Sequence, residues 1–80
     1  MKFKIISEIS QVETIARGPG VHARQMLNNA YGYGSWRKMK GVAIVEYVNR
    51  EIWLVEVHWY EAHGIGRRRE KDKRRIRRIS

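Results

Sequence analysis

Three side chains capable of acid–base chemistry occur at every second residue of one apolar stretch: Glu56, His58 and Tyr60. In a β-strand this spacing places them on one face, with neighbours about 6–7 Å apart. A carboxylate, an imidazole and nearby guanidinium groups are the set that a metal-independent ribonuclease needs. One group removes the 2′-hydroxyl proton, another protonates the leaving oxygen, and arginine stabilises the phosphorane. The spacing therefore makes Glu56, His58 and Tyr60 candidate catalytic residues.

The C-terminal segment carries most of the positive charge of the chain. The 80 residues have a net charge of +9, of which residues 67–80 contribute +7 and residues 1–66 only +2. The basic residues of this segment are Arg67, Arg68, Arg69, Lys71, Lys73, Arg74, Arg75, Arg77 and Arg78. A nucleic acid is the commonest partner of such a run, because each neutralised phosphate releases a counterion. We expect an RNA to bind here, with ribosomal RNA among the candidates. The alternative interpretation is that this segment is a solvated charged end or a targeting patch.

Further candidates for nucleic-acid contact lie in and after a glycine-containing loop. Tyr33 and Trp36 are expected to stack on unpaired bases, and Arg37, Lys38 and Lys40 to meet phosphates. Trp53 and Trp59 fall on an apolar stripe and are expected to be core residues.

No metal, cofactor or membrane segment is expected. The chain has no cysteine. His58 and His63 with Glu56 or Glu61 match no zinc-ligand spacing. No stretch approaches the roughly 18 apolar residues of a membrane span. These features favour a cytoplasmic protein that does not bind membranes. The oligomeric state is left open by the sequence.

The elements expected to position these residues form an α+β fold, with two N-terminal helices packed on a small antiparallel sheet. Residues 1–6 predict a short strand. Helical spacing of apolar residues, together with a capping-box pattern, predicts helices near 8–17 and 21–31, the second ending at Gly32. Residues 42–48 and 52–60 are rich in β-branched and aromatic side chains and predict two strands. Residues 1–66 are then one domain.

Two details of the sheet bear on the site. A tight turn at Asn49-Arg50 would place Ala43 opposite Glu56, Gly41 opposite His58 and Met39 opposite Tyr60. Residues 67–80 are compatible with a third strand, a helix or a disordered arm. As a strand, strict alternation would put the odd residues 67–75 on one face and the even residues 68–76 on the other.

A family resemblance is carried by Trp36-Arg37-Lys38-Met39-Lys40-Gly41 and by the stretch from Glu56 to Gly66, with its His-Trp-Tyr-Glu core and Gly-Ile-Gly turn. These residues resemble small bacterial proteins and toxin-like domains. The expected order of helices and sheet is similar to that of RelE/ParE and barnase-like ribonuclease toxins. This resemblance implies an RNA-cleaving or ribosome-associated toxin with an antitoxin-like protein partner, and chemistry at Glu56, His58 and the arginines after Gly66. A module that docks on an acidic protein is a third interpretation.

Overall fold

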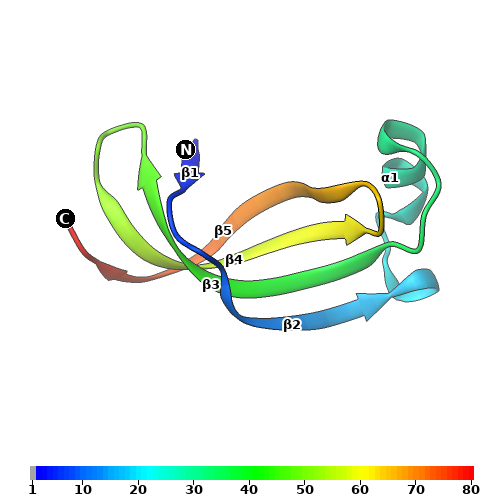
Figure 1. Ribbon diagram of the computed structural model, residues 1–80, viewed down its shortest axis with the longest axis horizontal. Helices are drawn as coiled ribbons and strands as arrows, with labels where there is room; N and C mark the ends of the chain where they lie inside the picture. Colours follow the sequence, from blue (N-terminus) through cyan, green and yellow to red (C-terminus); the bar gives the residue numbers. More distant parts are fainter. Residues whose placement is uncertain (1) are drawn as a thin grey trace.

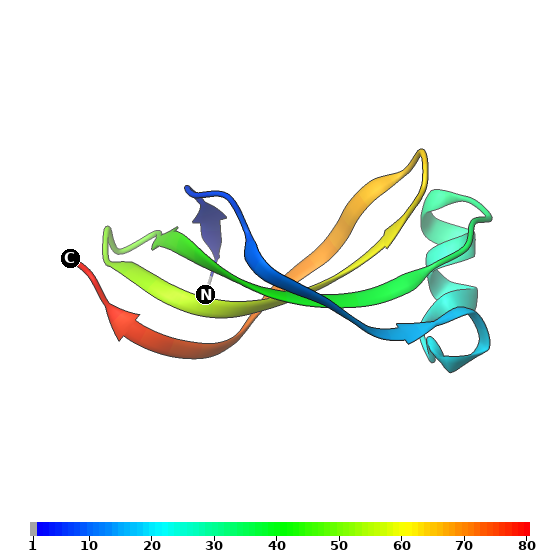
Figure 2. The ribbon, with the colours of Figure 1, turned by 60° about the horizontal axis from the view of Figure 1, so that its bottom comes forward.

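In the computed structural model, which describes residues 2–80, the chain is a bent antiparallel sheet with one short α-helix at its end (Figures 1 and 2). The strands are β1 (Phe3–Ile5), β2 (Ser10–Arg17), β3 (Arg37–Tyr47), β4 (Ile52–Ala62) and β5 (Gly66–Arg78); the helices are a 3-10 turn, η1 (Gly18–Gly20), and α1 (Arg24–Tyr31). The expected architecture of two helices packed on a sheet is therefore wrong. The strand expected at 1–6 is β1, and Met1 lies outside the described residues.

The sheet is built around the long hairpin of β3 and β4. Its strand order is β1-β3-β4-β5, and β2 pairs with β3 beside β1. β1 pairs with the C-terminal half of β3, and β2 pairs with its N-terminal half. β4 is thus a central strand, as its apolar residues on both faces predict.

The register of the β3–β4 hairpin differs by one residue from the expected one. Tyr47 N–H donates to the Glu51 carbonyl oxygen, so the loop has three residues, 48–50, and not two. Arg50 adopts the left-handed conformation with φ 74°, as the last residue of such loops does. The one-residue shift changes every partner: Val42 faces Glu56, Lys40 faces His58, and Lys38 faces Tyr60.

The segment expected to be a helix near 8–17 is β2. Two shifts of register interrupt its pairing with β3, between Ser10 and Glu13 and between Thr14 and Ala16. The extra residues break the period of two. Val12 and Ile15, whose spacing of three suggested a buried helix face, are both exposed on this strand.

The second expected helix is present but starts later, at Arg24. Leu27 on α1 is buried, and Gly32, with φ 110°, forms the expected C-cap by donating its N–H to the Asn28 carbonyl oxygen. Across residues 2–80, no helix has the length and apolar character needed to cross a membrane.

Of the structures compatible with residues 67–80, the chain adopts the strand. β5 pairs along the whole length of β4. Its alternation is interrupted at three places, opposite Leu54/Val55, Glu56/Val57 and His58/Tyr60. The division into odd and even faces is therefore wrong, since each extra residue turns the following side chains to the opposite face.

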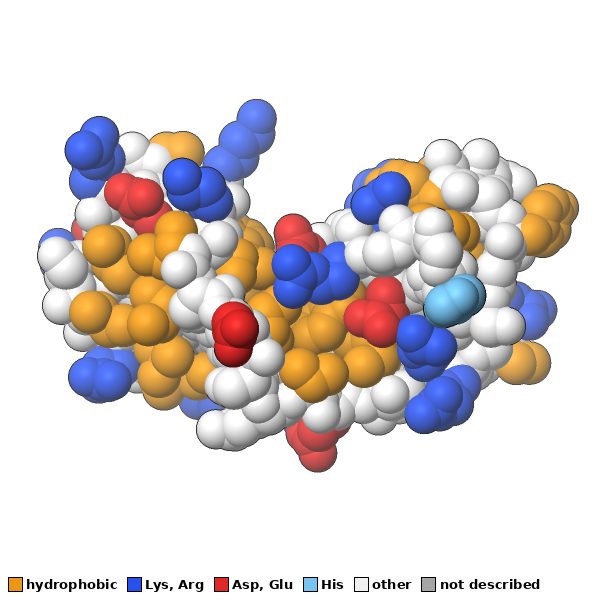
Figure 3. Space-filling view, viewed as in Figure 1, with side chains coloured by type: hydrophobic (Ala, Val, Ile, Leu, Met, Phe, Trp, Pro, Cys, Tyr) orange, Lys and Arg blue, Asp and Glu red, His pale blue; other side chains and the backbone are white. Residues whose placement is uncertain are grey.

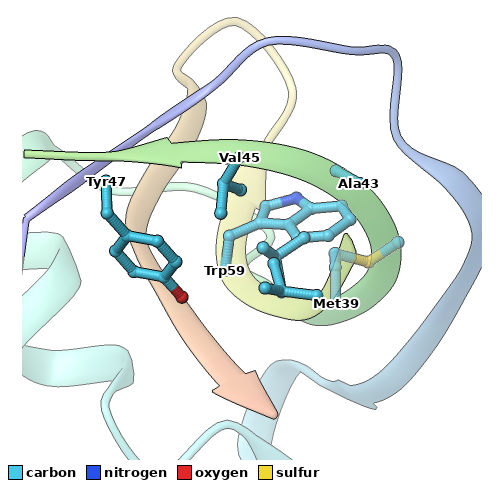
Figure 4. Packing of buried hydrophobic residues seen from close by; sticks show 7 residues of the cluster. Met39, Ala43, Val45, Tyr47 and Trp59 are labelled. Carbon is cyan, nitrogen blue, oxygen red and sulfur yellow. The ribbon is translucent and has the colours of Figure 1, made fainter. Parts of the chain in front are cut away.

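Each face of the sheet carries one apolar cluster. The inner face, inside the curl of β3 and β4, carries the odd-numbered side chains of these strands and holds the main core (Figure 4). Its buried members are Met39, Ala43, Val45, Tyr47, Val55, Val57 and Trp59, with Phe3, Ile5 and Ile9 packed on them. The outer face carries the even-numbered side chains. At one end, Val21 and Leu27 pack there with Trp36 and Ala62.

Candidate nucleic-acid interface

The outer face of the sheet brings the candidate catalytic residues together with basic side chains from both neighbouring strands. Residues directly opposite one another in a sheet share a face. Lys38 and Lys40 of β3 stand beside Tyr60 and His58 on one side. On the other side, β5 supplies the partners of Tyr60, His58, Glu56 and Leu54, which are respectively Arg68, Lys71, Arg74 and Arg77. Glu56, His58 and Tyr60 therefore lie between two basic rows.

Glu56 and His58 form the tightest polar contact of this face. The His58 Nε2 atom lies 2.7 Å from Glu56 Oε2, and the two side chains are 17% and 25% exposed. The hydrogen bond from His58 is the largest cause that lowers the pKa of Glu56; nearby positive charges on Lys40 and Arg74 act in the same direction. Glu56 is therefore held as a carboxylate at neutral pH.

The imidazole of His58 has little freedom in this arrangement. Its Nε2 is engaged by Glu56, and its Nδ1 is buried with no hydrogen-bond partner among residues 2–80. A general acid must present its proton to the leaving oxygen. His58 reaches that role only by giving up its contact with Glu56; in the observed contact it positions the carboxylate.

A pocket of about 280 Å³ opens on the outer face beside Glu56. Val42, Leu54 and Ile76 form its apolar part. Lys40, Glu56 and Arg74 supply charged groups. Gln11 and Glu13 of β2 complete the lining, and Glu13 lies 3.4 Å from Lys40. These two residues were missed in the sequence, because a helix near 8–17 gives no reason to place them beside Glu56.

A smaller pocket of about 60 Å³ adjoins His58 and Tyr60. Its other lining residues are Lys38, Trp59, Arg69, Lys71 and Lys73, so positive charge predominates. The Lys38 ammonium stands 6.0 Å from the centre of the Tyr60 ring. The neighbourhood of His58 and Tyr60 is thus the most basic part of the outer face.

Several residues expected at the interface lie elsewhere. Trp36 is fully buried and donates its Nε1–H to Asn28 Oδ1, so the expectation of a surface stacking residue is wrong. Arg37 pairs with Glu61 at 2.9 Å on the inner face. Arg75 also points inward: its guanidinium lies 4.4 Å from the Tyr47 ring and 4.9 Å from the Trp53 ring.

The remaining basic residues of β5 are spread around the strand. Arg67 pairs with Glu70 at 3.3 Å, and Arg78 is near Glu51 at 4.0 Å. Arg69 donates to the Tyr31 hydroxyl of α1. Tyr33, in the loop after α1, is 87% exposed and remains free to stack on a base.

The space-filling view shows a surface hollowed between the two ends of the molecule, with apolar side chains at its middle and charged ones around them (Figure 3). Nowhere in residues 2–80 do three or more histidine or carboxylate side chains gather closely enough to hold a metal ion. Comparisons with protein families, curated proteins and solved structures found no match. The resemblance to toxin-like domains therefore depends on the quoted residues alone. The first helix of its expected architecture, near 8–17, is the strand β2.

Proposed function

We propose that the protein binds RNA through the outer face of its sheet. The observation that carries the proposal is the convergence of basic side chains from β3 and β5 on one face, around Tyr60 and His58. Arginine and lysine at such positions neutralise phosphates, and tyrosine offers a ring for an unpaired base. The inner face cannot serve the same purpose, because it is filled by the core.

The proposal is tested by titrating a labelled RNA with the protein at several salt concentrations. We expect strong binding at low salt and a steep linear decrease of log K with log salt, because binding releases counterions. The variant Lys40→Gln/Arg74→Gln removes one charge from each side of the outer face and should weaken binding. Arg17→Gln/Arg50→Gln, at two exposed positions away from the outer face, removes the same charge and is the matched control. Absence of RNA binding at low salt would overturn the proposal.

A second candidate function, metal-independent cleavage of RNA, is favoured by the Glu56–His58 pair. In this reaction Glu56 accepts the proton of a 2′-hydroxyl, and that oxygen attacks the adjacent phosphorus. His58, released from Glu56, protonates the departing 5′-oxygen, so a 2′,3′-cyclic phosphate and a 5′-hydroxyl are formed. Arg74, whose guanidinium lies 3.5 Å from Glu56 Oε1, is placed to stabilise the charge of the phosphorane.

Incubation of the protein with RNA in the presence of EDTA tests this second function. We expect cleavage products that end in a cyclic phosphate, with loss of activity in both Glu56→Gln and His58→Ala. Retained RNA binding in these two variants shows that the loss comes from chemistry. No cleavage by the wild-type protein, or full cleavage by His58→Ala, would reject the catalytic function and leave RNA binding in place.

A further inference from the structure

The basic residues that β5 contributes to the outer face of the sheet recur at every third position of its sequence. Arg68, Lys71, Arg74 and Arg77 pair with Tyr60, His58, Glu56 and Leu54 of β4. Their partners are spaced by two residues, which corresponds to about 6.4–6.8 Å along a strand. The four basic residues therefore form a row with a step of that length, in spite of their spacing of three in the sequence.

The bulges of β5 produce this match. Between successive members of the row, β4 advances by two residues and β5 by three, so each step of β5 contains one extra residue. Arg69, in the first step, adopts the left-handed conformation with φ 60°. A bulge takes up an extra residue and keeps the next side chain on the same face. Each of the three steps contains one bulge, so the period of the row is built into the strand.

The row is open to a ligand. Lys71 and Arg77 are exposed and form no ion pair with any residue from 2 to 80. The Arg74 side chain is 65% exposed, although it lies near Glu56. The row ends at α1, where the Arg68 guanidinium stands 5.3 Å from the centre of the Tyr31 ring.

We propose that this row is a phosphate ladder, which binds the backbone of a single-stranded nucleic acid lying along β5 with one phosphate at each step. Successive phosphates of an extended strand are separated by about the step of the row. The phosphates of each strand of an A-form duplex turn around the helix axis, so they leave a row that follows one β-strand after a few steps. The inference rests on the proposed function and adds the class of ligand, a single strand. The ladder recognises the spacing of the phosphates and does not distinguish ribose from deoxyribose.

A rearrangement of charge at constant net charge tests the ladder. The double variant Glu70→Lys/Lys71→Glu puts a carboxylate in the row and a lysine beside it. We expect the affinity for a single-stranded oligouridylate to fall roughly tenfold or more, the cost of one lost charge-assisted contact. A general attraction between a basic protein and a polyanion would leave the affinity unchanged, and that result would overturn the ladder.

The salt dependence gives a second measurement. Lys71→Gln, Arg74→Gln and Arg77→Gln should each reduce the slope of log K against log salt by about 0.7, the value for one phosphate of a single strand. Arg78→Gln, on the same strand but opposite Trp53 of the inner face, and Arg50→Gln, in the β3–β4 turn, lose the same charge and should leave the slope unchanged. Equal reductions in all five variants would overturn the ladder.

A duplex of the same length separates the ladder from the proposed function. Weaker binding of the duplex than of the single-stranded oligouridylate supports the ladder. Equal or stronger binding of the duplex overturns it and leaves RNA binding intact. Circular dichroism and thermal unfolding of each variant verify that the fold is retained. If neither RNA binds the wild-type protein at low salt, the proposed function falls, and the ladder falls with it.

Discussion

On the inner face of the sheet, Asp72 accepts a hydrogen bond of 2.6 Å from the Tyr47 hydroxyl, and the Arg75 guanidinium lies over the Tyr47 ring. On the outer face, Lys71 and Arg74 precede these two residues in the chain and point away from the core. Charged residues side by side in one strand thus have different tasks: one set fastens β5 to the core, and the other remains available to a ligand. The charged residues of the C-terminal segment therefore form two groups, one structural and one exposed. Substitutions can test the two groups separately.

The largest difference between the two faces is expected between the neighbours Trp59 and His58. Trp59→Ala should lower the free energy of unfolding by about 3–5 kcal/mol, since it empties part of the core. His58→Ala, on the outer face, should cost no more than about 1 kcal/mol, the range of a partly exposed ion pair. Denaturation in urea measures both values. Similar losses in the two variants would show that the outer face is also structural.

A smaller difference is expected between Tyr47 and Lys71. Tyr47→Phe removes the buried hydroxyl that Asp72 and Arg75 contact, and should cost about 1–3 kcal/mol of stability. Lys71→Gln should change stability by less than about 0.5 kcal/mol. RNA affinity should show the reverse order, with the lysine variant the weaker binder. An equal effect of the two substitutions on affinity would contradict the separation of tasks.

Acidification should weaken the fold through carboxylates that hold β4 and its neighbours. The pKa of Glu61 is lowered, first by the hydrogen bond from Trp59 Nε1 and then by Arg37. The unfolded chain therefore takes up the proton first as the pH falls. The stabilisation is complete above the ordinary glutamate pKa of about 4.3 and is lost as the pH falls through the lower pKa of the folded state. Unfolding midpoints should decrease in that range, and less so in Glu61→Gln. An unchanged pH dependence in this variant would exclude Glu61 as the cause.

The smallest expected effect on stability is that of Tyr33→Ala. The side chain is almost fully exposed, so thermal unfolding should be unchanged within about 0.5 kcal/mol. If the ring stacks on a base, RNA affinity should fall by about 1–3 kcal/mol. An unaltered affinity would show that Tyr33 does not contact the RNA and that the binding residues lie on the sheet.

The sequence predicted the parts of this fold whose signals are local. β3 and β4 were recognisable from β-branched and aromatic residues, and α1 from its apolar spacing and Gly32. The shared face of Glu56, His58 and Tyr60 also follows from the alternation of β4. The structure of these segments could be predicted from their own residues, without knowing which distant segments they contact.

The errors lie where extra residues interrupt a strand. In β2, the extra residues break the alternation of a strand, and the spacing of three between Val12 and Ile15 was interpreted as that of a helix. At the β3–β4 turn, Arg50 takes a left-handed conformation more typical of glycine or asparagine, so the three-residue loop was not visible. In β5, alternation predicted the wrong faces, because bulge positions depend on the pairing with β4. The buried position of Trp36 depends on contacts with Asn28 and α1, which its own segment does not reveal.

The location of β5 at the border of the sheet also bears on how copies of the protein behave at high concentration. Of the described strands, β5 pairs with β4 alone, so its far side carries unpaired backbone groups over 13 residues. A flat, apolar strand in this place would be a template for the addition of another chain, and so for aggregation. The like charges and bulges of β5 discourage such pairing. Neutralising the arginines and lysines of this strand should therefore reduce solubility as well as ligand affinity.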